Sequence, residues 1–87
     1  MKIYVSQQHI NSGVRGSCTQ DPISLALADA GFSRPWSGPV CLRAGGREFA
    51  TPPEVLEFMK TFDNNYGPVY PFEFEVGVSG GFDGDAR

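Results

Sequence analysis

Ligands for soft metals are scarce in this chain, whose 87 residues include one histidine and two cysteines. Cys18 and Cys41 are far apart in the sequence, and neither belongs to a paired motif. Structural zinc sites use four cysteine or histidine ligands, commonly in closely spaced pairs, so we expect no metal site. Two cysteines also do not make the disulfide framework of a small secreted domain. We expect free thiols, with a single Cys18–Cys41 disulfide left open.

Long apolar runs are missing as well. No stretch approaches the ~20 apolar residues that a membrane-spanning helix requires. No signal-peptide pattern opens the chain. We therefore expect a cytoplasmic protein that does not contact a membrane.

Positive charge is in deficit over the whole chain, whose net charge is −3. Non-specific binding to duplex nucleic acid comes from neutralising phosphates with lysine and arginine, so this balance disfavours such a partner. The charge is uneven, however. Residues 1–47 hold five lysines and arginines against two carboxylates, and residues 48–87 hold two against eight. The first half is compatible with a small anionic ligand.

The composition is that of a small globular protein. An apolar fraction of 40% and eleven aromatic residues argue against disorder. We expect one compact domain over 1–76 and a flexible tail, rich in glycine and aspartate, over 77–87. A chain this short buries only about 60% of its unfolded surface, so association into a homo-oligomer would help its thin core.

The first quarter of the chain predicts a strand and a short helix. Lys2–Ser6 alternates polar and apolar residues, as a half-buried strand does. Ser6 is a suitable N-cap for a short helical turn over Gln7–Ser12. We expect Gly13 to close that turn in a left-handed conformation.

A longer helix is predicted over 22–30. Asp21 suits its N-cap and Pro22 its first position, while Gly31 is suited to end it. A connector over Phe32–Pro39 follows, rich in turn-forming residues.

The second half predicts a hairpin, a helix and a strand. Val40–Arg43 and Arg47–Ala50 flank a glycine-rich turn. Thr51 and Glu54 have the spacing of a capping box, which begins a second main helix. The apolar stripe of this helix consists of Val55, Phe58, Met59 and Phe62. Pro71–Val76 alternates again and predicts a final strand with its glutamates in water.

These elements follow the order β-short α-α-β-β-α-β and indicate the α+β class. The economical packing is a small, largely antiparallel sheet of three to four strands with the two main helices on one face.

The loop between the first two helices predicts a binding site. Gly13 and Gly16 allow a ligand to approach the main chain. Arg15 offers a planar fork of donors suited to phosphate or carboxylate. Ser17 and Thr19 add hydroxyls, and the following helix start adds N–H groups and the positive end of its dipole. A purely structural loop is the alternative, because the spacing matches no known phosphate-binding motif and Asp21 would repel an anion.

Other polar and aromatic residues complete the predicted site. Trp36 and Tyr66 could stack a nucleobase, although aromatic residues in turns also close the ends of small cores. His9 could contact a ribose or phosphate, but it could equally be a packing residue. We place Cys18 near a helix start, but no general base accompanies it, so we expect no catalytic residues. The predicted ligand-binding set is His9, Ser12, Arg15, Gly16, Ser17, Thr19, Trp36 and Tyr66.

Three stretches resemble a family of small proteins encoded by bacteriophages and prophages. They are 9–13 (HINSG), 18–27 (CTQDPISLAL), and Phe62-Asp63 taken together with 71–76 (PFEFEV). Relatives often carry Cys-x-x-Cys-Pro where this chain has Cys18 and Asp21. That departure argues against a required metal or redox pair. The resemblance implies a viral accessory protein, and small phage proteins of this size often act on host immunity. We expect no cofactor.

Two functions follow as hypotheses. The first is a non-enzymatic protein that binds and sequesters a small anionic ligand, such as a nucleotide immune signal. The second is an inhibitor of a host defence complex, anti-CRISPR-like, whose acidic second half mimics nucleic acid. A hydrolase or transferase that uses Cys18 and His9 is the least favoured hypothesis.

Overall fold

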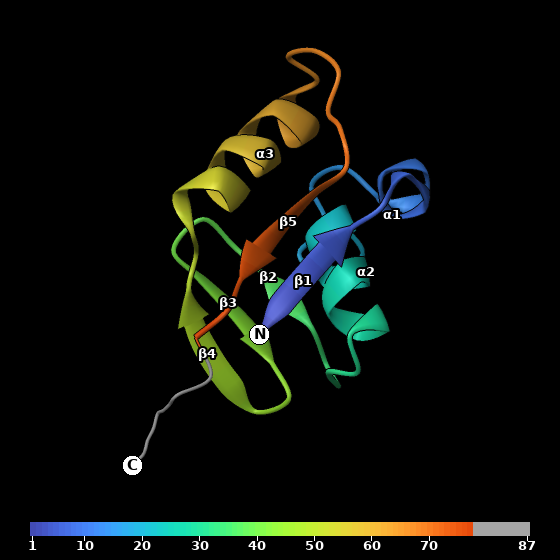
Figure 1. Cartoon of the computed structure of the whole chain (residues 1–87). Helices are drawn as coiled ribbons and strands as arrows, with labels where there is room; N and C mark the ends of the chain where they lie inside the picture. Colours follow the sequence, from blue (N-terminus) through green and yellow to red (C-terminus); the bar gives the residue numbers. More distant parts are fainter. Residues whose placement is uncertain (78–87) are drawn as a thin grey trace.

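The structure is a computed structural model that describes residues 1–77 (Figure 1). Its α+β class and mostly antiparallel strands are those predicted from the sequence. Within these residues there are three helices and two antiparallel sheets, in the order β-α-α-β-β-β-α-β. The predicted tail lies outside this range, apart from Gly77.

One sheet pairs the first described strand with the last. β1 (Lys2–Val5) runs antiparallel to β5 (Phe72–Glu75), with Ile3 opposite Phe74. Ile3 and Phe74 are buried, while the side chains on either side of them along each strand are more exposed or, at Val5, buried again. The exposed ones are Lys2, Tyr4, Glu73 and Glu75. The alternation that predicted both strands therefore also sets their inward faces.

The short helix α1 (Gln7–Ser12) begins with a capping box. The Ser6 hydroxyl accepts a hydrogen bond from the His9 N–H, and the Ser6 N–H donates to His9 Nδ1 at 3.0 Å. The predicted left-handed Gly13 is wrong, because its φ of −69° and ψ of 147° are extended. A different constraint requires glycine there: an added Cβ would lie 2.5 Å from the Pro22 ring.

Helix α2 (Pro22–Asp29) begins as predicted, with Asp21 at its N-cap and proline at its first position. Asp21 Oδ1 accepts a hydrogen bond from the Ser24 N–H at 2.8 Å. The helix buries Ile23 and Leu27, and it lies beside β1 (Figure 1).

The second sheet has three strands in the order β2-β3-β4. The predicted hairpin is confirmed, but its first strand is shifted by one residue: β3 (Cys41–Ala44) includes Ala44, which was predicted to lie in the turn, and pairs with β4 (Arg47–Ala50). Gly45 and Gly46, with φ of 61° and 78°, form the turn, as two-residue hairpins of this kind require. The predicted connector contains a further strand, β2 (Trp36–Ser37), which pairs with β3.

Helix α3 (Pro53–Asn64) buries the stripe predicted for it. Its capping box is wrong: Pro52 is the N-cap, and Thr51 Oγ1 instead donates to the Gly38 carbonyl at 2.7 Å. The helix ends at Asn65, whose φ of 54° is left-handed.

One core joins all the layers. Buried side chains come from both sheets, α2 and α3, and full burial stabilises each large aliphatic side chain by ~1.5–3 kcal/mol. The strands divide between two sheets where one was expected, because β5 pairs with β1 and not with the hairpin. None of the helices in residues 1–77 is long and apolar enough to cross a membrane.

Candidate functional site

The loop over 13–20 uses its backbone donors within the fold. The Gly16 N–H donates to Asp63 Oδ1 at 3.1 Å, and the Ser17 N–H donates to the Val14 carbonyl at 3.3 Å. The Ser17 hydroxyl accepts from the N–H groups of Thr19 and Gln20. These donors therefore bond to separate acceptors within the protein, and only the Gly16 N–H meets a carboxylate, that of Asp63.

At the start of α2, the carboxylate of Asp21 likewise accepts hydrogen bonds from groups of the protein itself. Its side chain is 2% exposed, and Oδ2 accepts a hydrogen bond from the Ser37 hydroxyl at 2.5 Å. The Ser24 hydroxyl donates to the Cys18 carbonyl at 2.7 Å, and the Ser37 N–H donates to that carbonyl at 2.8 Å. Burial raises the pKa of Asp21 above its ordinary value, although the two serines oppose the rise. This buried polar cluster ties the loop, α2 and β2 together.

Arg15 closes the other side of the loop against α3. Its Nε donates to the Phe62 carbonyl at 2.9 Å, and its Nη2 donates to Asn65 Oδ1 at 3.2 Å. The guanidinium carbon lies 5.1 Å from the centre of the Phe62 ring. A cation at a helix C-terminus satisfies terminal carbonyls and complements the helix dipole. Arg15 therefore holds the end of α3.

We expect Arg15→Met to lower the free energy of unfolding by about 1–2 kcal/mol. The methionine keeps apolar contact with Phe62 but loses the hydrogen bond to its carbonyl, the favourable dipole and the cation–π contact. Urea denaturation monitored by circular dichroism measures the change. Arg15→Lys should recover part of the loss, since it keeps the charge. An unchanged midpoint for Arg15→Met would contradict this role.

A polar cavity of about 450 Å³ lies beside Arg15. Of the predicted ligand-binding set, it includes Arg15 alone in its lining. Gly13 and Asn11 line it from the α1 side, and Phe62 and Asn65 line it from the end of α3. The carbonyls at the end of that helix carry partial negative charge, which opposes an anion here.

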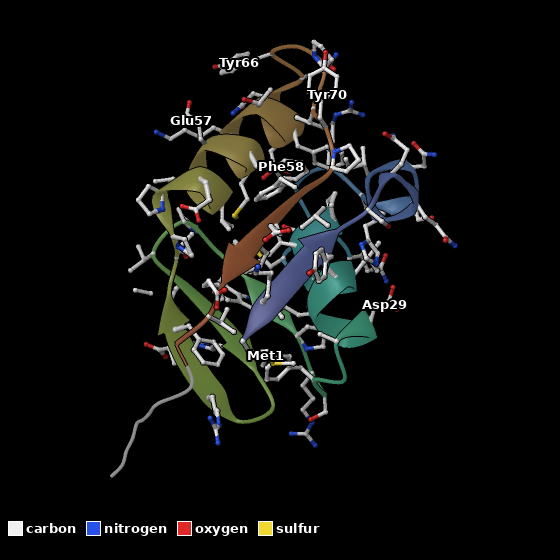
Figure 2. The ribbon with its side chains drawn as sticks, viewed as in Figure 1. Met1, Asp29, Glu57, Phe58, Tyr66 and Tyr70 are labelled. Carbon is white, nitrogen blue, oxygen red and sulfur yellow. The ribbon has the colours of Figure 1, made fainter. Side chains whose placement is uncertain are left out.

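The remaining predicted residues do not line this cavity. His9 Nδ1 accepts a hydrogen bond from the N–H of Ser6, the N-cap of α1. Its Nε2 is then free to donate to Asp29 Oδ2 at 2.5 Å, which links α1 to α2. Ser12 and Thr19 are exposed. Tyr66 is 77% exposed on the connection after α3 (Figure 2).

Trp36 contacts a different arginine. The guanidinium carbon of Arg43 lies 5.1 Å from the centre of a Trp36 ring, and a Cβ added at Gly38 would lie 2.5 Å from the indole. Trp36 thus packs within the three-stranded sheet. The structure does not bring Trp36, Tyr66 and Arg15 together around one ligand.

Three arginines that the site prediction left out line one cavity. Arg34, Arg43 and Arg47 surround a space of about 280 Å³ near the turn of the β3–β4 hairpin, with Glu48 as the single carboxylate. The turn and the 32–35 segment lie at the end of the molecule opposite the connection after α3 (Figure 1). We call this the arginine pocket.

Backbone pairing builds the arginine pocket. Trp36, Arg43 and Glu48 are direct neighbours across β2, β3 and β4. Arg43 Nε lies 3.4 Å from Glu48 Oε1. The Gly45 N–H donates to the Ser33 carbonyl at 2.7 Å, which holds the segment that carries Arg34 against the hairpin turn. Residues far apart in the sequence therefore converge.

The electrostatics of the arginine pocket favour an anion. Its ionisable side chains carry a net charge of +2. Within residues 1–77, the side chains of Arg34 and Arg47 form no ion pair or hydrogen bond, whereas Arg43 shares Glu48. Guanidinium groups bind phosphate and carboxylate oxygens in pairs, and the cavity is at the small end of ligand sites. The pocket can hold a compact phosphate or diphosphate group.

A sequence signal for part of this pocket exists. Two-residue hairpin turns fix the register, so Gly45-Gly46 already implies that Arg43 faces Glu48. Arg34 is placed by a contact between distant segments, for which no local pattern exists.

Within residues 1–77, histidine, cysteine and carboxylate side chains form no cluster of three that could hold a metal ion. Comparison with known protein families, curated proteins and solved structures finds no match for this chain.

Proposed function

We propose that this protein is a non-enzymatic binding protein for a small phosphate-bearing ligand, held in the arginine pocket. The observation that carries the proposal is the convergence of Arg34, Arg43 and Arg47 on one cavity with a single carboxylate. Each guanidinium provides several N–H donors in one plane, which match phosphate oxygens.

Competition inside the fold also supports this assignment. Asp63 already accepts from the Gly16 N–H in the loop over 13–20, Asp21 accepts from the Ser24 N–H in the first turn of α2, and Arg15 donates to the end of α3. Arg34 and Arg47 have no such partners within the described residues. An added phosphate would gain charge-assisted hydrogen bonds without breaking any of theirs.

The biological role follows from the sequence resemblance to small phage proteins. We propose that the ligand is a nucleotide immune signal and that the protein sequesters it. Sequestration requires binding without turnover, and Glu48 already pairs with Arg43. Trp36 contributes by supporting Arg43 from beneath, and a base would stack on it only if Arg43 moved.

Isothermal titration calorimetry with inorganic pyrophosphate, ADP and cyclic dinucleotides tests the proposal. We expect binding that weakens as salt is raised, because the contacts are between charges. Arg34→Gln and Arg47→Gln should each lower the affinity about 10-fold or more, since a hydrogen bond to a charged group contributes ~1.5–3 kcal/mol.

Two variants serve as controls. Lys60→Gln removes one positive charge from the exposed face of α3 and should leave affinity unchanged. Arg15→Met tests whether the ligand binds in the cavity beside Arg15 and not in the arginine pocket. If Arg15→Met abolishes binding while Arg34→Gln and Arg47→Gln do not, the ligand site is at the loop over 13–20. If none of the three probes binds, the proposal is wrong.

A further inference from the structure

A second surface, remote from the arginine pocket, combines exposed aromatic residues with negative charge. It is a groove of about 420 Å³ between α3 and the connection to β5. Phe58, Val69 and Phe72 form its floor, and Phe58 and Phe72 have ring centres 4.9 Å apart. In Figure 2, Phe58 lies between α3 and β5, and Tyr70 stands on the connection. We call it the α3–β5 groove.

The α3–β5 groove continues onto the neighbouring strand. An adjoining hollow of about 380 Å³ shares Pro71 and Phe72 with it and reaches Tyr4 on β1. Tyr70 is 69% exposed and Tyr4 is 63% exposed. Partly exposed tyrosines around an apolar floor are typical of protein interfaces, where tyrosine is enriched among the few residues that dominate the binding energy.

Every charged residue that lines the two hollows is a glutamate. Glu54 and Glu57 line the α3–β5 groove, and Glu73 lines the adjoining hollow. Lys2 pairs with the third of these glutamates, and its Nζ lies 2.9 Å from Glu73 Oε2. The hydrogen bond to Glu73 raises the pKa of Lys2. Glu54 and Glu57 have no ion pair within residues 1–77, so an incoming cation could pair with either.

We propose that the α3–β5 groove docks a cationic amphipathic segment of a partner protein. Apolar side chains of that segment would pack on Phe58, Val69 and Phe72, while its lysines or arginines would pair with Glu54 and Glu57. Apolar anchors in a groove with complementary charge at the rim are a common mode of peptide recognition.

Charge also argues against a second copy of this chain as the occupant. Two copies meeting groove to groove would bring Glu54, Glu57 and Glu73 of one against the same residues of the other. Like charges brought together in this way oppose association. The occupant therefore carries positive charge of its own.

The test uses fluorescence anisotropy with the intact protein and a labelled 14-residue peptide that alternates lysine with leucine. A matched peptide carries glutamate in place of each lysine. We expect saturable binding of the lysine peptide and at least 10-fold weaker binding of the glutamate peptide. Glu54→Lys combined with Glu57→Lys should weaken binding of the lysine peptide about 10-fold or more.

Two further variants separate docking from general attraction to an acidic protein. Tyr70→Ser leaves the charge unchanged and should still weaken binding several-fold. The charge-matched control replaces four exposed neutral residues that line neither hollow nor the arginine pocket, Gln8, Gln20, Ala28 and Val40, each with lysine. It changes the net charge by the same amount as the groove variant and should alter affinity less than 2-fold. Circular dichroism verifies that each variant is folded.

The contrary outcomes are equally definite. Equal losses for the groove variant and its charge-matched control, or an unchanged affinity for Tyr70→Ser, would overturn the groove as the docking site. Light scattering of the protein alone adds a third measurement. An oligomer that dissociates on Glu54→Lys with Glu57→Lys would show that a second copy is the occupant and would also overturn the proposal.

Discussion

Asp21→Ala is expected to lower the free energy of unfolding by about 3 kcal/mol at pH 7. The substitution removes the N-cap of α2, which contributes ~1–2 kcal/mol, and the charged acceptor of the Ser37 hydroxyl, which contributes ~1.5–3 kcal/mol. Relief from burying a carboxylate offsets part of the loss. Urea denaturation followed by circular dichroism measures the change. A loss below about 1 kcal/mol would show that the buried cluster around Asp21 contributes little.

The pH dependence of stability tests whether burial disfavours the ionised form of Asp21. The folded-state pKa of Asp21 is raised above its ordinary value of 3.8 by burial. Between 3.8 and that raised pKa, the folded protein therefore binds a proton that the unfolded chain does not, so unfolding free energy rises as pH falls. We expect wild-type protein to gain stability relative to Asp21→Asn as the pH falls from 7 towards the ordinary value of 3.8. A constant difference between the two proteins would contradict a raised pKa.

Gly13→Ala is expected to cost about 2–3 kcal/mol of stability, near the top of the range for overpacking. The extended backbone at Gly13 is open to any residue, so the effect is steric. An added Cβ would lie 2.5 Å from Pro22 Cδ and 2.9 Å from the Pro22 backbone nitrogen. The proline ring begins α2 and cannot rotate away, so α1 and α2 would have to separate.

The matched control is Gly77→Ala, since nothing lies within 4 Å of the Cβ it would add. There the change should not destabilise the protein and should raise its stability by up to about 1 kcal/mol, because alanine restricts the unfolded chain. Thermal unfolding of both variants compares them directly. If the two melting temperatures agree, close approach is not the reason for glycine at position 13.

Local signals were sufficient for most of the helices and strands. Asp21 and Pro22 began α2 where predicted, because an N-cap and a first-turn proline act on adjacent backbone groups. Gly45 and Gly46 likewise fixed the hairpin. The alternation in β1 and β5 indicated their buried faces, since the side-chain period of a strand is two.

Where the prediction was wrong, the residue concerned forms a hydrogen bond with a partner outside its own segment. Thr51 has the spacing of a capping residue, but its hydroxyl donates to the Gly38 carbonyl, and Pro52 takes the N-cap position. Trp36 and Ser37 lie among turn-forming residues, yet β3 recruits them as a strand. Neither partner is visible in the sequence around these residues.

The candidate site shows the same division. The donors predicted over 13–20 are present, but Asp63, more than 40 positions away, accepts from the Gly16 N–H. Arg43 and Glu48 follow from hairpin register, whereas Arg34 joins them through the contact between Gly45 and Ser33. Residue types predicted an anion site, and the proposed position of that site depends on tertiary contacts that the sequence does not show.

The pairing of β1 with β5 has a consequence for synthesis in the cell. A ribosome releases β1 first and β5 last, so Ile3 and Val5 have no strand partner while the chain is being made. Folding of this sheet must wait for residues 72–75 to emerge. A nascent chain stalled before them would expose apolar side chains, which is the surface that chaperones bind.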